Sequence, residues 1–212
     1  MSCGTSKKPK YIPVHAINYP PLVMDNVIAY HSVTGCDTTS QLSGKAKRST
    51  WKVYLRDPAL LAQLGEFPGL SEEARAPAEQ FVCGIYGYGS TSCINDVRLK
   101  MFSKGKSSVE SLPPSQDALH LHLDRANYQA FIWKKAVEPK PDCPLPTDHG
   151  WVMESGKLKP KMTRLDRIPK NCAELVTCSC KAECIATRCG CLKTSFLPTS
   201  DPRQPRYEPC RL

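Results

Sequence analysis

Apolar side chains recur at intervals of three and four residues along much of the chain, and this spacing predicts helices rather than strands. The clearest stripe follows Ser115, which can cap a helix, and continues to Trp133. Two further helices are expected over residues 22–33 and 46–55, joined by a tight polar connection. Shorter helices are expected over residues 58–64, after Ser71 and after Thr91 or Ser92. We therefore expect a mainly α fold, a helical body with little strand.

Proline divides this helical body from the rest of the chain. There are 19 prolines among 212 residues, about twice the usual share of roughly 5%. Because proline interrupts helices and strands, the segments rich in it are expected to be linkers. Four parts are expected: a basic helical pair (residues 1–57), a helical body (58–137), a proline-rich and basic linker (138–171), and a cysteine-rich segment with a disordered tail (172–212).

Positive charge is concentrated in two short segments. The net charge is +9, whereas residues 1–56 hold eight cations against two anions and residues 157–170 hold six against one. Such segments are suited to phosphate groups, so we predict a nucleic-acid partner, and DNA in particular. The candidate contacts are Lys45, Lys47, Arg48 and Lys52 in the first segment and Lys157, Lys159, Lys161 and Arg164 in the second.

The apolar runs are too short for a membrane protein. No stretch approaches the roughly 18 consecutive apolar residues that a spanning helix needs, so we expect no membrane partner. The first residues lack the apolar run of a signal peptide, which predicts a location inside the cell. For a nucleic-acid-binding protein we expect the nucleus. Thiols are kept reduced there, so clustered cysteines predict metal ligands rather than disulfides.

Half of the twelve cysteines lie within twenty residues near the C-terminal end. Closely spaced thiolates are typical zinc ligands, and the polar residues between them argue against the alternative of buried, unliganded thiols. Zinc also supplies folding free energy to a segment with few large apolar side chains. We predict a small zinc-stabilised segment whose ligands are Cys172, Cys178, Cys180, Cys184, Cys189 and Cys191.

The spacing from Cys178 to Cys191 resembles the CXC module of tesmin/TSO1-like proteins. In that family a larger set of cysteines shares several zinc ions and the module binds DNA, so the resemblance implies both ligands for this chain. After Cys191 no further cysteine occurs until Cys210, whereas the family has another close run. We interpret the segment as a truncated module able to hold one or two zinc ions.

A second motif, His31-Ser-Val-Thr-Gly-Cys-Asp37, lies between the first two predicted helices and is followed by Gly44-Lys-Ala-Lys47. Asp37 is either an ordinary helix cap or a metal ligand, and the Gly-Lys-Ala-Lys turn offers N–H groups and ammonium charge to phosphates. Together with the run from Leu112 onward, the motif resembles a family of uncharacterised animal proteins associated with transposons. This resemblance implies an origin in a mobile element.

More distantly, the Gly-Cys-Asp turn is similar to the metal-binding turn of flap-endonuclease-like (PIN/XPG-type) nucleases. That resemblance implies a catalytic role for Asp37 as a ligand of magnesium or manganese. Two-metal chemistry requires several convergent carboxylates, and the chain contains no Asp-x-Asp. We therefore expect a fragment that binds nucleic acid and zinc and is non-catalytic as it stands. Two alternatives stay open: the C-terminal part of a magnesium-dependent nuclease, and a protein-interaction fragment without ligand.

Overall fold

The computed structural model describes residues 2–5, 8–11, 13–105 and 109–165. Contacts between residues divide the chain into two compact units, residues 1–163 and 164–212. Nearly all of the described residues belong to the first unit. This unit is mainly helical, which confirms the expected fold class, whereas the predicted zinc segment lies outside the described residues. None of the described helices is long and apolar enough to cross a membrane.

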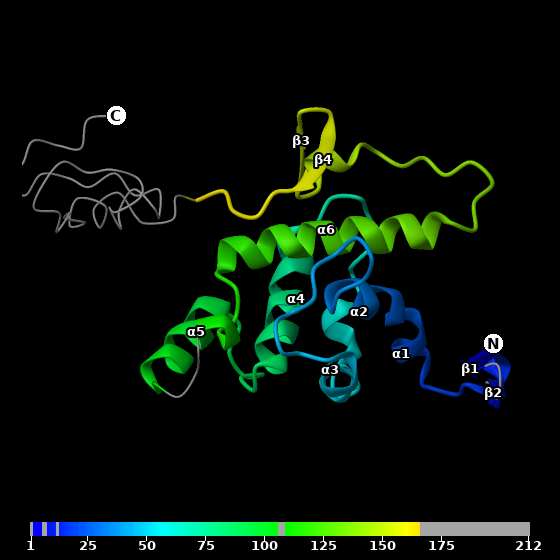
Figure 1. Cartoon of the computed structure of the whole chain (residues 1–212), viewed down its shortest axis with the longest axis horizontal. Helices are drawn as coiled ribbons and strands as arrows, with labels where there is room; N and C mark the ends of the chain where they lie inside the picture. The colour runs from blue at the N-terminus through cyan, green and yellow to red at the C-terminus, as the bar shows by residue number, and fades with distance from the viewer. Residues whose placement is uncertain (1, 6–7, 12, 106–108, 166–212) are drawn as a thin grey trace, which may run out of the picture. The chain divides into compact units, whose positions relative to one another are not determined.

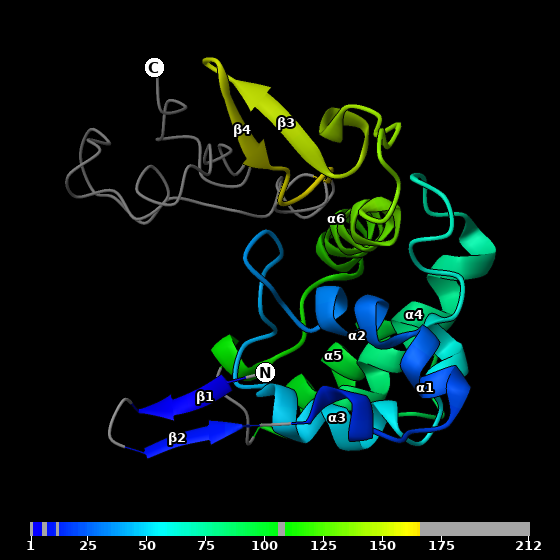
Figure 2. The same ribbon diagram turned by 90° about the vertical axis from the view of Figure 1, so that its right-hand side faces the viewer.

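Six α-helices and two short antiparallel hairpins make up the described elements (Figures 1 and 2). The α-helices are α1 (Pro21–Asp25), α2 (Val27–Val33), α3 (Lys47–Tyr54), α4 (Glu72–Ile85), α5 (Ile94–Ser103) and α6 (Gln116–Lys135). The hairpins pair β1 (Ser2–Thr5) with β2 (Lys8–Tyr11) and β3 (Trp151–Glu154) with β4 (Lys157–Pro160). Short 3-10 helices are η1 (Val14–Ala16), η2 (Pro58–Leu61), η3 (Val109–Ser111) and η4 (Pro146–Asp148).

The long helix α6 organises the first unit, because it packs across both α2 and α4 (Figure 1). Its N-terminus is capped as predicted, since the Ala118 N–H donates to the Ser115 hydroxyl oxygen at 3.3 Å. The predicted apolar stripe is buried as well, and Leu119, Leu123, Ala126 and Ala130 are fully inaccessible to solvent. The other sides of α6 are also covered along much of its length, which the stripe did not indicate.

Aromatic rings fill the core where α2, α3 and α4 meet. The rings of Tyr30 and Tyr54 stack with their centroids 4.7 Å apart, and the ring of Phe81 lies edge-on to both at 6.4 Å. The Tyr54 hydroxyl donates to the Val23 carbonyl oxygen at 2.7 Å, so the ring buries its polar end with a partner. Residues 1–57 and 58–137, which were expected to be separate parts, therefore share one hydrophobic core.

The helix predicted over residues 22–33 is interrupted at Asn26. Here α1 ends and α2 begins, and the buried Asn26 side chain donates to the carbonyl oxygens of Leu22 at 2.9 Å and Pro58 at 3.3 Å. The second of these bonds spans 32 residues, so a tertiary contact accounts for the break. The apolar spacing continues through it, which is why the sequence suggested one helix.

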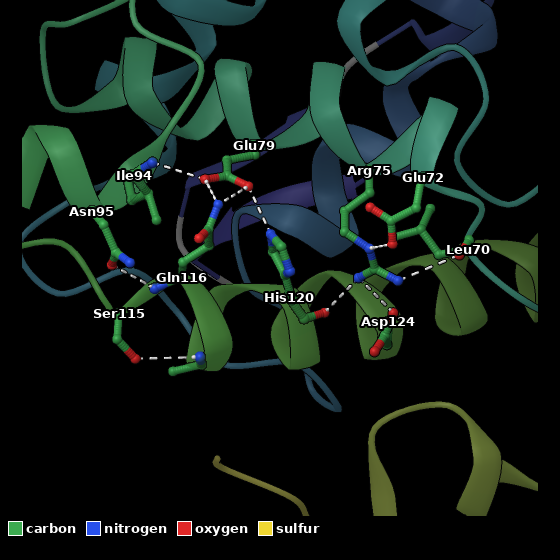
Figure 3. Close-up of polar contacts among 11 residues, drawn as sticks. Leu70, Glu72, Arg75, Glu79, Ile94, Asn95, Ser115, Gln116, His120 and Asp124 are labelled. Atoms are coloured by element: carbon green, nitrogen blue, oxygen red, sulfur yellow. Dashed lines mark hydrogen bonds and ion pairs between the residues drawn. The ribbon is translucent and has the colours of Figure 1, made fainter. Parts of the chain in front are cut away.

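A buried polar network joins α4 to α5 and α6 (Figure 3). The Glu79 carboxylate accepts hydrogen bonds from the Ile94 backbone N–H at 2.8 Å, from the Gln116 amide at 3.0 Å and from His120 Nε2 at 2.7 Å. The start of α5 is thus capped by a carboxylate of α4, not by Thr91 or Ser92 as predicted. An interhelical cap of this kind has no local sequence signature.

A second part of the same network holds α4 to the middle of α6. The guanidinium of Arg75 forms an ion pair with Asp124 at 2.9 Å and also donates to the carbonyl oxygens of Leu70 and His120 (Figure 3). Both charged groups are almost fully buried. Removing either partner would leave an uncompensated buried charge, so this pair favours one position of α4 against α6.

The predicted linker 138–171 contains the β3–β4 hairpin. Its strands are joined by Ser155 and Gly156, both at positive φ, and its ends are tied together by the Lys161 N–H, which donates to the Gly150 carbonyl oxygen at 2.9 Å. Arg125 of α6 donates to the carbonyl oxygens of Gly150 at 3.0 Å and Lys161 at 2.7 Å. The hairpin is therefore attached to α6, by contacts that the proline content did not indicate.

Candidate nucleic-acid interface

Helix α3 presents a basic face to solvent. Thr50 and Tyr54 are buried against the core, whereas Arg48 and Lys52 are exposed and lie four residues apart, on one face of the helix. Arg56 extends this spacing by another four residues, in the turn that closes the helix, and is also exposed. We call Arg48, Lys52 and Arg56 the α3 cation row. Within the described part of the chain no carboxylate lies within ion-pair distance of the row.

Lys47 starts the same helix but has a structural role. Its Nζ donates to the His31 carbonyl oxygen at 2.9 Å and to the Thr34 hydroxyl oxygen at 2.7 Å. It thereby satisfies an acceptor at the C-terminal end of α2, where a positive charge is also favoured by the helix dipole. Partial burial lowers the pKa of Lys47. The ammonium group predicted to contact phosphate is thus engaged within the protein.

The remaining residue of the first predicted set, Lys45, lies over an aromatic ring. Its Nζ is 4.4 Å from the centroid of the Tyr86 ring, a distance suited to a cation–π contact. The preceding Gly44 has a φ of +67°, and nothing lies within 4 Å of a Cβ at that position. The Gly44–Lys45 turn is therefore open on its outer side and carries a partly covered cation.

The Gly-Cys-Asp turn is held together by hydrogen bonds. Gly35 has a φ of +102° and is required there, because a Cβ would lie 2.8 Å from Gln41 Cα. The Thr39 hydroxyl donates to the Ser32 carbonyl oxygen at 2.7 Å, and the Thr38 hydroxyl donates to Gln129 Oε1 on α6 at 2.6 Å. The turn is thus fixed to both the end of α2 and the side of α6.

The thiol of Cys36 forms part of this arrangement. Its Sγ lies 3.0 Å from the Thr39 hydroxyl oxygen. The same Sγ lies 3.4 Å from the Thr38 hydroxyl oxygen. Burial raises the pKa of the Cys36 thiol, but its hydrogen bonds with Thr38 and Thr39 outweigh this effect and lower the pKa overall.

Asp37 lies at the tip of the turn and is exposed. Among the described residues its carboxylate accepts no hydrogen bond from a helix end, so it does not act as the cap that the sequence analysis considered. In the same part of the chain, no three His, Cys, Asp or Glu side chains lie together so as to hold a metal ion. Among these residues Asp37 therefore belongs to no group of three such side chains, whereas two-metal chemistry needs several convergent carboxylates.

The second predicted set of cations lies on a different surface. Lys157, Lys159 and Lys161 are exposed on or beside β4, and Lys159 pairs with Glu154 at 3.0 Å. In both views the hairpin lies on the opposite side of α6 from α3 (Figures 1 and 2). The two sets therefore form separate basic surfaces. Arg164 is exposed and belongs to the second unit, and the six predicted zinc ligands Cys172, Cys178, Cys180, Cys184, Cys189 and Cys191 lie outside the described residues.

No protein-family model, curated protein or solved structure matches the chain. The resemblances to the CXC module, the transposon-associated family and the flap-endonuclease-like nucleases therefore stay predictions from the sequence. Two residues of interest are not among the predicted contacts. Arg56 could have been found from its four-residue spacing to Lys52, whereas the burial of Arg125 in the middle of α6 has no sequence signal.

Proposed function

We propose that this protein binds nucleic acid and that the α3 cation row contacts the phosphates. The observation that supports this proposal is that Arg48, Lys52 and Arg56 are all exposed and follow one another at intervals of four residues. No acidic residue occurs between Lys47 and Arg56. Neutralising phosphates releases condensed counterions, which drives binding without requiring a preformed pocket. A row of cations on a helix suits this mode of binding.

Three further features favour α3 over the other basic surface. The helix is fixed to the core by the Tyr30 hydroxyl, which contacts both the Lys47 carbonyl oxygen at 2.8 Å and the Thr50 hydroxyl at 2.9 Å. A rigid helix loses little conformational entropy when its side chains bind phosphate. Lys45 adds positive charge at the start of the helix. By contrast, part of the charge of the β3–β4 hairpin is offset by the ion pair of Lys159 with Glu154.

The cysteine-rich segment provides a second part of the proposal, which rests on the sequence alone. Zinc held by residues from Cys172 to Cys191 would fold a short module that adds nucleic-acid contacts to those of α3. Within this proposal the protein is a nuclear, non-catalytic binding protein that originates from a mobile element, and DNA is the expected nucleic acid. Magnesium or manganese has no part in it.

The proposal is tested by titrating the full chain against a fluorescent duplex and a fluorescent single strand, at salt concentrations from about 50 to 200 mM. Electrostatic binding predicts that log K falls linearly with log salt, with a slope of about −0.9 for each phosphate contact on duplex DNA. Failure to bind either probe at the lowest salt concentration would refute the proposal. A zinc determination on the same sample tests the cysteine-rich segment separately.

A further inference from the structure

A cleft of about 240 Å³ is lined by Ala118, His122 and Arg125 from the N-terminal half of α6 and by none of the residues of the α3 cation row. One wall is the loop of residues 40–43, and Met162, which follows β4, also lines the cleft. Most of the lining is apolar, and it includes Leu42, Tyr86, Leu112 and Pro114. The cleft lining contains no acidic side chain among the described residues. The cleft is therefore an apolar site without negative charge of its own.

Arg125 of α6 lines this cleft and is 97% buried, being 3% exposed. One nitrogen of its guanidinium, Nη1, donates to the carbonyl oxygens of Gly150 at 3.0 Å and Lys161 at 2.7 Å. Among the described residues no carboxylate lies within ion-pair distance of Arg125, and the adjacent Asp124 pairs with Arg75 instead. Buried cations are ordinarily paired, and the carboxylate whose charge acts on this guanidinium, Asp124, forms its ion pair with Arg75.

The same guanidinium has donors to spare. It carries five N–H groups, of which the two on Nη1 are taken by the two carbonyls. No described residue accepts from Nε or Nη2. In this part of the chain every fully buried side-chain nitrogen and oxygen has a partner, so Nε and Nη2 must keep some access to solvent. Arg125 lines the cleft, and we infer that these donors reach solvent through it.

We propose that the cleft binds a small apolar carboxylate, whose two oxygens accept hydrogen bonds from Nε and Nη2 of Arg125. The planar edge of a guanidinium matches a carboxylate in a bidentate pair, and the low polarity of the walls strengthens that pair. The volume is below the roughly 300 Å³ at which drug-sized pockets begin, so the ligand is about the size of one aromatic side chain. Lys45, held over Tyr86, adds positive charge near the same wall.

Phenylacetate is a suitable probe, and phenylacetamide is its neutral counterpart of the same shape. Binding to the full chain is measured by NMR, with the methyl signals of Leu42 and Met162 as reporters of the cleft. We expect phenylacetate to shift these signals and to bind at least tenfold more tightly than the amide. Equal binding of the two compounds, or no shift of the two methyl signals at millimolar phenylacetate, would overturn the proposal.

Two variants locate the site. Arg125→Lys keeps the charge but loses the bidentate edge, and it is expected to weaken phenylacetate at least tenfold. Ala118→Phe fills the cleft from α6 without altering Arg125, and it is expected to abolish binding even where the first variant folds poorly. The matched control Ala136→Phe adds the same ring at an exposed position on the other end of α6 and should bind as the parent does. Unchanged affinity in Ala118→Phe would place the ligand elsewhere and contradict the proposal.

Discussion

The ammonium group of Lys47 lies 2.9 Å from the carbonyl oxygen of His31, so the first residue of α3 closes the end of α2. Thirteen residues of loop separate the two helices, from Thr34 to Ala46. The contact therefore fixes the orientation of α3 relative to α2. It thereby also determines which side of the protein the α3 cation row faces. Lys47, one of the predicted phosphate contacts, thus also positions the other cations of α3.

Replacement of Lys47 by Met should lower the free energy of unfolding by about 1–2 kcal/mol, because two charge-assisted hydrogen bonds are lost and the α2 carbonyl is left without them. Chemical denaturation of the full chain measures this difference. Lys52→Met is the matched control, since Lys52 is exposed on the same helix, and it should change stability by less than about 0.5 kcal/mol. Equal effects of the two substitutions would show that the Lys47 contacts do not stabilise the fold.

Glu79→Ala should be far more damaging than a change to a surface carboxylate. It removes the acceptor for Ile94, Gln116 and His120 at a side chain that is 5% exposed, and we expect a loss of about 3 kcal/mol. Glu72→Ala is the control, because Glu72 is 81% exposed and should contribute less than about 1 kcal/mol. If Glu79→Ala lowers the free energy of unfolding no more than Glu72→Ala does, the Glu79 network does not determine stability.

Stability should fall below about pH 6.5 because of His122. Burial lowers the pKa of this histidine from its ordinary 6.5, and the charge of Arg125 lowers it further, while the hydrogen bond from Nε2 to the Val33 carbonyl oxygen opposes them. Below pH 6.5 the unfolded chain therefore takes up a proton that the folded chain does not, so the free energy of unfolding decreases as the pH falls.

His122→Gln keeps an N–H donor for Val33 but cannot titrate, and this substitution isolates the effect. Burial also lowers the pKa of His31 and His149, so the parent and the variant share that part of the pH dependence. Denaturation curves between pH 5 and 8 should show a shallower decline for the variant, by up to about 1.4 kcal/mol per pH unit. Parallel declines in the two proteins would exclude His122 as the cause.

Zinc should copurify with the full chain if the cysteine cluster is a metal site. The double substitution Cys180→Ser and Cys184→Ser is expected to remove most of the bound zinc, since a structural site needs its full set of ligands. Cys143→Ser is the control, because Cys143 is an exposed free cysteine far from the cluster in sequence. Zinc-free protein from the parent sequence, measured by elemental analysis, would refute the predicted ligand set.

Local signals in the sequence predicted the helices well. Ser71 and Ser115 cap α4 and α6, and the apolar stripe of α6 is buried, because caps and periodic burial depend on residues close in the chain. Long-range contacts could not be predicted. Asn26 breaks a helix through a bond to Pro58, and Glu79 caps a helix from another one.

The candidate site shows the same division. The exposed position of Arg48 and Lys52 follows from helical spacing, which is a local property. Two other features depend on tertiary structure: Lys47 contacts the end of α2, and the β3–β4 hairpin lies apart from α3. A count of charges in the sequence cannot distinguish these cations from one another. Arg125 was missed because a buried arginine looks like a surface one in the sequence.

The α3 cation row is tested most directly by the salt dependence of DNA binding in two triple variants that remove the same charge. Arg48→Ala/Lys52→Ala/Arg56→Ala removes the row, and Lys157→Ala/Lys159→Ala/Lys161→Ala removes the cations of the β3–β4 hairpin; circular dichroism confirms that both fold. We predict that the first variant reduces the slope of log K against log salt by about 2–3, whereas the second leaves it nearly unchanged. An unchanged slope in the first variant, or an equal loss in the second, would contradict the assignment of α3 as the interface.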